Sequence, residues 1–220
     1  MEKKAIRVKR HAVAAPLVVF TIGHSTRTSE DFNRLLKAHL VKRLVDVRTV
    51  PRSRFNPQFN RDQVSQAMHR LRIHYRYMPG LGGFRHALRD STNTGWHNAS
   101  FRGFADYMQT PEFRKNLDAL IELAKHERIA VMCAEAVPWR CHRSLIADAL
   151  LARGIEVREI TSTSGARLHS LTPWARIKGT EVSYPGEPSS LEPHRKIQAP
   201  RPPKSMNKSA APHVVRTERE

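Results

Sequence analysis

Five short segments carry the hydrophobic pattern of β-strands. Short apolar runs bounded by turn residues are typical of buried strands. Around Tyr75, apolar and polar residues alternate instead, which is the pattern of a half-exposed strand and suits the edge of a sheet. The strands expected on this basis cover residues 17–22, 44–47, 73–77, 129–133 and 155–160.

Between these segments, apolar residues recur every three or four positions, which is the spacing of one face of a helix. Thr28, Asn60 and Thr110 each stand where a helix cap is expected, and Gly154 stands where a helix would end. The expected buried faces are Phe32, Leu35, Leu36 and Leu40; Val64, Ala67, Met68 and Leu71; Phe113, Leu117, Leu120, Ile121 and Ala124; and Leu145, Ile146, Ala149 and Leu150.

The alternation of strands and helices predicts an α/β fold, because each helix can return the chain to a parallel neighbouring strand. We expect a compact single domain over residues 17–172, with a mainly parallel sheet of about five strands flanked by helices. Residues 1–16 form a basic N-terminal arm, and residues 173–220 hold eight of the fourteen prolines and no apolar periodicity. Both ends are therefore predicted to be flexible basic tails.

The charge balance is strongly basic, with a formal net charge of +18. Four of these charges lie in residues 1–16 and four in residues 176–220, which leaves +10 on the part between them. A balance of this kind favours polyanionic partners, most often nucleic acid. The basicity belongs to the expected domain as well as to its tails.

The sequence shows no feature typical of a secreted or membrane-spanning protein. The two cysteines provide no disulfide framework, and the apolar stretch 12–22 is interrupted by Pro16 and is too short to span a bilayer. No signal peptide is recognisable at the N-terminus. We therefore expect a cytoplasmic protein that has no membrane partner.

Polar residues follow every expected strand, and in parallel sheets the carboxyl ends of the strands form the ligand-binding edge. Arginine side chains, glycine loops and free N–H groups at a helix start together favour an anion, such as a nucleotide or a nucleic-acid phosphate. The expected ligand-binding residues are Arg48, Arg52, Arg54, Arg143, Gly82, Gly83 and Ser25.

The most reactive residue expected at this edge is Cys141, which lies at the start of a helix beside His142 and Arg143. A helix N-terminus and neighbouring cations lower the pKa of a thiol, so Cys141 is the predicted nucleophile. His142, Glu135 and His24 are the groups expected to move protons.

Other interpretations of the same residues stay open. Cys133 ends a buried strand, where a cysteine commonly packs as a small hydrophobe. A zinc site formed by both cysteines, His142 and His24 has an unusual gap of seven residues between the cysteines, so no metal site is predicted. A cysteine-phosphatase loop would need five residues between Cys133 and Arg140, and here there are six. Any one arginine could also serve only in a structural ion pair.

Five short motifs resemble one known family. They are Thr-Ile-Gly-His-Ser at 21–25, Asp-Val-Arg at 46–48 with Pro-Arg-Ser-Arg at 51–54, Leu-Gly-Gly at 81–83, Met-Cys-Ala-Glu at 132–135 and Cys-His-Arg at 141–143. In this order they are similar to the domain-of-unknown-function 488 family, from about residue 17 to residue 160. The resemblance implies a compact α/β domain. It implies no activity, substrate or cofactor, so the cofactor is unknown.

Two classes of function are consistent with these observations. The first is an anion-binding domain with a thiol-dependent enzymatic activity at the edge of the sheet. The second is a non-catalytic nucleic-acid-binding accessory protein that uses its basic surface and tails, with an affinity that falls steeply with salt. The sequence does not separate a small-ligand sensor from the enzyme, and it does not indicate the oligomeric state.

Overall fold

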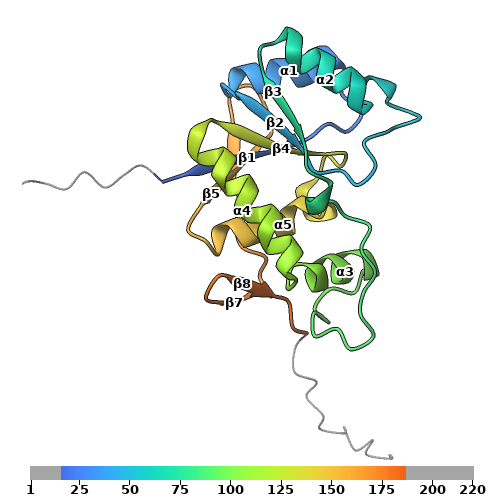
Figure 1. The fold of residues 1–220 in the computed structure, drawn as a ribbon, viewed down its shortest axis with the longest axis vertical. Coiled ribbons are helices and arrows are strands. Elements are labelled where there is room, and N and C mark those ends of the chain that lie inside the picture. The colour runs from blue at the N-terminus through green and yellow to red at the C-terminus, as the bar shows by residue number, and fades with distance from the viewer. Residues whose placement is uncertain (1–15, 187–220) are drawn as a thin grey trace, which may run out of the picture. The chain divides into compact units, whose positions relative to one another are not determined.

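A six-stranded sheet forms the centre of the protein in the computed structural model, which describes residues 16–186 (Figure 1). The strand order is β3-β2-β4-β1-β5-β6, and only β6 is antiparallel to its neighbour. The mainly parallel α/β fold is therefore confirmed, and β6 is an additional strand that the hydrophobic pattern did not predict. The strands are β1 (Val18–Gly23), β2 (Arg43–Asp46), β3 (His74–Tyr77), β4 (Ile129–Cys133), β5 (Glu156–Ile160) and β6 (Ala166–Leu168).

The middle of the sheet is formed by β4, which is buried along its whole length. It pairs with β1 on one side, so that Gly23 lies opposite Cys133. On the other side it pairs with β2, so that Asp46 lies opposite Met132. The carboxyl ends of three strands therefore finish side by side, and this is where the candidate site forms.

Helices cover both faces of the sheet (Figure 1). One face packs against α1 (Ser29–Ala38) and α2 (Arg61–Arg70), and the other packs against α3 (Ala99–Tyr107), α4 (Pro111–His126) and α5 (Arg143–Leu151). Because successive side chains of a strand point to opposite faces, Met132 packs with the first set of helices and Cys133 with the second. The strand therefore presents the Cys133 sulfur to the face covered by α5.

The predicted helix starts are largely correct. The hydroxyl of Thr28 accepts a hydrogen bond from the backbone N–H of Asp31 at 3.1 Å, and Thr110 caps α4 in the same way. Asn60 precedes α2, but its side chain does not cap that helix, because its amide oxygen accepts from the backbone N–H of Ser53. Among residues 16–186, no helix is long and apolar enough to span a bilayer. The longest helix of this part of the chain, α4, has 16 residues.

The ends of two helices differ in how well the pattern predicted them. Gly154 follows α5 with a positive φ of 73°, as expected for a helix-ending glycine. Leu40, in contrast, lies beyond the end of α1 and is 63% exposed, so it is not part of the buried face.

Three short 3-10 helices follow strands β2, β3 and β4: η1 (Pro57–Phe59), η2 (Pro79–Leu81) and η3 (Pro138–Arg140).

Residues 173–186 are folded, which corrects the expectation that the tail begins at residue 173. Strands β7 (Arg176–Lys178) and β8 (Glu181–Ser183) form an antiparallel hairpin. Tyr184 is fully buried, and its hydroxyl donates to Oδ2 of Asp148 at 2.8 Å. A few anchoring side chains hold this segment, and their spacing has no helical or alternating period. The expected arm at residues 1–15 and the rest of the expected tail, 187–220, lie outside the described residues.

Candidate functional site

A cavity of about 400 Å³ lies at the carboxyl ends of β2 and β4. A second cavity, of about 360 Å³, shares Arg48, Arg52 and Glu135 with the first and is also lined by His24 and Ser25. The structure thus brings most of the predicted site residues to one edge of the sheet. The first cavity is lined by Arg48, Thr49, Val50, Arg52, Gly83, Phe84, Ser100, Phe101, Cys133, Ala134, Glu135, Arg140, Cys141 and His142.

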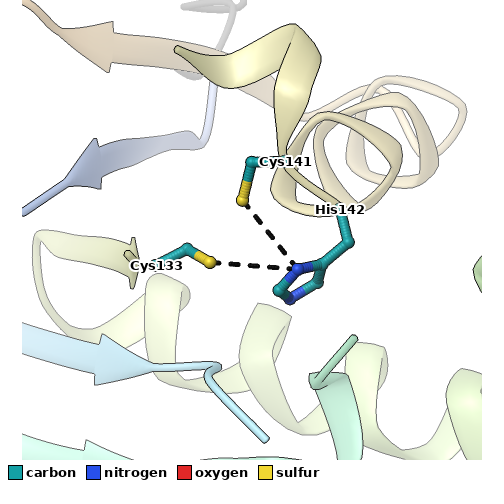
Figure 2. Close-up of side chains that lie close together, drawn as sticks. All are labelled: Cys133, Cys141 and His142. Carbon is teal, nitrogen blue, oxygen red and sulfur yellow. Dashed lines mark hydrogen bonds between the residues drawn. The ribbon is translucent and has the colours of Figure 1, made fainter. Parts of the chain in front are cut away.

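Two thiols and one imidazole converge on the wall of the first cavity (Figure 2). Nδ1 of His142 lies 3.8 Å from Sγ of Cys133 and 3.9 Å from Sγ of Cys141. The three donor atoms all lie within 4.8 Å of one another. Both cysteines are buried, and Nε2 of His142 is buried without a hydrogen-bond partner among residues 16–186.

The chain path explains this convergence. Cys133 is the last residue of β4, and the loop after it turns through η3 before it reaches Cys141. The backbone N–H of Cys141 donates to the carbonyl of Pro138, and the Cys133 carbonyl accepts from the N–H of His24. Both sulfur-bearing residues are therefore held by backbone hydrogen bonds, one at a strand end and the other just before a helix.

The two thiols differ in acidity. A hydrogen bond from Cys141 lowers the pKa of Cys133 well below that of an ordinary thiol, against the effect of burial, and His142 acts in the same direction. The same contact and the burial of the sulfur raise the pKa of Cys141. The direction for Cys141 is opposite to the expected lowering of its pKa, because burial and the neighbouring sulfur favour the protonated thiol.

Arg48 lines both cavities and is held in place by an ion pair. Its guanidinium makes two hydrogen bonds to the carboxylate of Asp46, from Nε to Oδ1 at 2.9 Å and from Nη2 to Oδ2 at 2.6 Å. The hydroxyl of Tyr75 donates to the same carboxylate at 2.7 Å. Burial lowers the pKa of Arg48, but its hydrogen bond and ion pair with Asp46 more than offset this, so the net pKa is raised and the cation persists.

His24 connects this ion pair to the end of β1. Its ring stacks on Phe59 at a centroid distance of 4.2 Å. Nδ1 lies 2.9 Å from the Ser25 carbonyl and therefore carries the proton, which leaves Nε2 to accept from Nη1 of Arg48 at 3.2 Å. Burial lowers the pKa of His24 and keeps the ring neutral. Both ring nitrogens are therefore engaged, one by the backbone and the other by Arg48.

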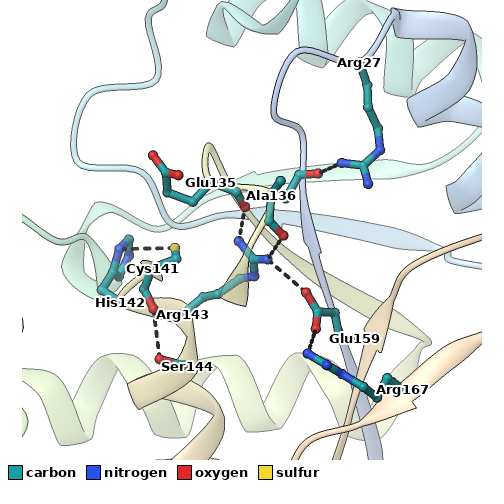
Figure 3. A network of polar contacts seen from close by, with 10 residues as sticks. Arg27, Glu135, Ala136, Cys141, His142, Arg143, Ser144, Glu159 and Arg167 are labelled. Carbon is teal, nitrogen blue, oxygen red and sulfur yellow. Dashed lines mark hydrogen bonds and ion pairs between the residues drawn. The ribbon is translucent and has the colours of Figure 1, made fainter. Parts of the chain in front are cut away.

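Arg143 does not line either cavity, although the sequence analysis placed it among the anion-binding residues. It is fully buried, and Figure 3 shows its guanidinium directed at the loop after β4. It donates to the carbonyls of Glu135 and Ala136 and pairs with Glu159 at 3.2 Å. Arg143 therefore fixes the loop that carries the site.

The same loop lies directly against the end of β1. A Cβ atom built at Gly23 would lie 1.8 Å from the carbonyl oxygen of Glu135, so only glycine fits there. The Glu135 carboxylate itself is exposed and lines both cavities. The backbone of this residue is thus structural, while its side chain is available to a ligand.

The remaining predicted residues divide into two groups. Arg52 lines both cavities, whereas Arg54, two residues further along the same loop, lines neither. Gly83 lines the first cavity, and a Cβ there would lie 3.1 Å from Nδ1 of His142. Gly82 does not line either cavity and instead allows the loop to pass close to Thr49.

Several residues of the first cavity were not among the expected site residues, and three of them, Arg140, Phe84 and Phe101, bear on its chemistry. Arg140 is exposed and lines the first cavity, and its position directly before Cys141 was the available signal. Phe84 and Phe101 form an apolar part of the wall. Phe84 is 79% exposed and has a positive φ of 55°, so no hydrophobic pattern could have marked it.

Comparison with known families identifies one match. The model of the family described as "Domain of unknown function DUF488" matches residues 28–150. This range includes the Arg48 loop and the whole segment from Cys133 to Arg143. Comparisons with curated proteins and with solved structures found no match.

Proposed function

The chain belongs to the family of the domain of unknown function DUF488, and we propose that its cavity binds a phosphate-bearing or other anionic ligand and acts on it in a thiol-dependent reaction. The observation that carries this proposal is that three arginines and two buried thiols line one cavity. The anionic ligand and the thiol group would then meet at the carboxyl edge of a parallel sheet, where ligands of such folds commonly bind.

The charge of the cavity supports an anion. Arg48, Arg52 and Arg140 line it, and Glu135 is the one acidic residue in its wall. Arg48 is rigid because of its buried ion pair, while Arg52 and Arg140 are exposed and form no ion pair within the described part of the chain. The latter two guanidinium groups are therefore free to form the paired hydrogen bonds that phosphate accepts.

The size and the apolar part of the wall indicate the rest of the ligand. A volume of about 400 Å³ is within the range of small-molecule and cofactor sites. The wall of the cavity also has an apolar part, which is formed by Val50, Phe84 and Phe101. A ligand with an anionic group and a flat apolar part, such as a nucleotide, fits both features.

Binding of an anion can be tested with two exposed arginines and a matched control. We expect Arg52→Gln and Arg140→Gln each to weaken the binding of inorganic phosphate or a nucleoside monophosphate about tenfold or more, because each loses a charge-assisted hydrogen bond. Arg54→Gln removes the same charge from the same loop but does not line either cavity, so its affinity should stay within about twofold of the wild type. Titration calorimetry measures all three. Equal weakening in all three variants would contradict a specific anion site.

The thiol dependence needs a separate test. We expect phosphate to slow the alkylation of Cys133 and Cys141 by iodoacetamide, because ligand and thiols share one cavity. In a screen of phosphate esters and nucleotides, turnover found with the wild type should be lost in Cys133→Ser and in Cys141→Ser. Wild-type turnover in both serine variants would end the thiol-dependent proposal, and circular dichroism would show that each variant is folded.

A second candidate is nucleic-acid binding without catalysis, which the net charge of +18 favours. This function predicts that the affinity for an oligonucleotide falls steeply as salt increases, since phosphate contacts release counterions. An affinity that does not change with salt would exclude it. The cavity proposal does not require such a slope, so the two functions can be told apart.

A further inference from the structure

We propose that Cys133, Cys141 and His142 together bind a divalent metal ion of the zinc class, with an open coordination position that faces the cavity. This inference rests on the proposed function and deepens it. The thiols then contribute to the reaction as metal ligands, which gives a chemical reason for a buried sulfur pair beside an anion pocket.

The spacing of the three donor atoms fits one ion. With typical zinc–sulfur and zinc–nitrogen bonds of about 2.3 and 2.0 Å, a sulfur and a nitrogen at a tetrahedral angle lie about 3.5 Å apart, and two sulfurs about 3.8 Å apart. Nδ1 of His142 lies 3.8 Å from one sulfur and 3.9 Å from the other. Figure 2 shows that both sulfurs point to this same nitrogen, so the three atoms surround a common point. The two sulfur–nitrogen distances thus exceed the coordinated value by only a few tenths of an ångström, and all three donor atoms lie within 4.8 Å of one another.

The chemistry of the donor set selects the metal. Two sulfurs and an imidazole favour zinc and other thiophilic metals, whereas magnesium and calcium require oxygen ligands. The group of three contains no carboxylate. The backbone N–H of Cys141 donates to the Pro138 carbonyl, and the Cys133 carbonyl accepts from the N–H of His24. The two sulfur ligands are therefore held in place before an ion binds.

The number of ligands indicates the kind of site. Structural zinc sites use four protein ligands, whereas catalytic sites use three and leave one position for water or substrate. Here three ligands lie in the wall of a cavity of about 400 Å³. Arg52 and Arg140 line the same cavity, so an anion that they bind is brought next to the open position.

The unusual spacing in the sequence has a structural explanation. Short cysteine spacings are typical of sites in which a single turn supplies both sulfurs. In this protein, one sulfur comes from the end of β4 and the other from the residue two positions before α5. The seven residues between them form a loop, and the Arg143 guanidinium donates hydrogen bonds to two carbonyl groups of this loop. The gap reflects that loop and does not argue against a shared ion.

Cobalt(II) provides a direct test, because its absorption reports both sulfur ligation and tetrahedral geometry. The reduced full-length protein, freed of metal with a chelator, is titrated with Co²⁺ alone. We expect one equivalent to give the visible bands of tetrahedral cobalt together with a sulfur-to-cobalt charge-transfer band, and Zn²⁺ to remove both. The absence of the charge-transfer band in the reduced wild type would overturn the inference.

Variants identify the ligands. We expect Cys133→Ser, Cys141→Ser and His142→Gln each to weaken Co²⁺ binding at least about 100-fold, since even residues that only support metal ligands contribute 10- to 100-fold. His24→Gln is the matched control, because His24 borders the neighbouring cavity but is not one of the three donors. It should keep both absorption bands. Unchanged affinity in Cys141→Ser would overturn the three-ligand site.

The same variants separate this inference from the proposed function. In the metal-free protein, Arg52→Gln should weaken phosphate binding about tenfold or more and leave the Co²⁺ titration unchanged. Cys141→Ser should lose Co²⁺ binding and keep phosphate binding in the metal-free protein. If phosphate binds and cobalt does not, the metal site is wrong and the anion pocket stands. If cobalt binds and phosphate does not, the anion pocket is wrong and the metal site stands.

Discussion

Asp46 is the residue on which the rigidity of the anion pocket most depends, and its replacement by Asn gives a quantitative prediction. The carboxylate is fully buried and accepts hydrogen bonds from Arg48 and Tyr75. Burial and the nearby carboxylate raise the pKa of Tyr75, so its hydroxyl stays protonated and continues to donate. An Asn at this position keeps one acceptor oxygen but directs an N–H₂ group at one of these donors. The charge of Arg48, which is 5% exposed, is then left without its counterion.

We expect Asp46→Asn to lower the free energy of unfolding by about 3 kcal/mol, the lower end of the range for breaking a buried ion pair, because one acceptor is kept. For a domain of this size, such a loss lowers the melting temperature by about 6–12 °C. Tyr75→Phe, which removes one hydrogen bond, should cost about 1 kcal/mol. Arg34→Ala, at a pair whose arginine is 68% exposed, should change stability by no more than about 0.5 kcal/mol.

Urea denaturation followed by circular dichroism measures these values, since the midpoint and slope of the transition give the free energy of unfolding. The order of the three losses matters as much as their size. If Asp46→Asn cost less than about 1 kcal/mol, or less than Tyr75→Phe, Arg48 would not depend on this carboxylate. The argument for a rigid cation that lines the cavity would then fail.

Three further predictions concern the elements around the site. Burial lowers the pKa of His24, so below about pH 6.5 the unfolded chain takes up a proton that the folded chain does not. The free energy of unfolding of the wild type should therefore fall with acid by up to about 1.4 kcal/mol per pH unit. His24→Gln should lack this contribution, and pH profiles of stability that run parallel in the two proteins would contradict it. Tyr184→Phe leaves Oδ2 of Asp148 without its donor and should cost about 1–3 kcal/mol in urea denaturation, whereas an unchanged midpoint would show that this bond is unimportant. Gly23→Ala places a Cβ 1.8 Å from the Glu135 carbonyl oxygen and should cost about 3 kcal/mol or more, and a wild-type melting temperature would disprove the close approach.

The sheet was predictable from the sequence because its parallel strands carry local signals. The β4 segment is apolar throughout, and polar residues follow shortly after β1, β2, β4 and β5. Strand β6 has no such signal, because two of its three residues are exposed and its only partner is β5. The segment that ends at Tyr184 was missed for a similar reason. Its stability comes from single long-range contacts, and these leave no period in the sequence.

The site was predictable as a set of residues but not as an arrangement. Arg52 and Arg54 are the same residue type on the same loop, and only the folded chain shows that one lines the cavity and the other does not. Arg143 was expected to face an anion, but it is buried against carbonyl groups. Cys133 was interpreted as packing, and its meeting with the second sulfur depends on a loop path that no spacing rule describes.

The strand order also determines when the sheet can form during synthesis. β1 pairs only with β4 and β5, so from the end of β1 at Gly23 until β4 begins at Ile129 it has no neighbour in the sheet. At 5–20 residues per second, this interval of roughly 100 residues lasts about 5–20 s. During that time only β2 and β3 can pair, and β1 cannot form any of its hydrogen bonds to the sheet. The strand that ends in Cys133 is therefore also the one whose synthesis allows the sheet to close.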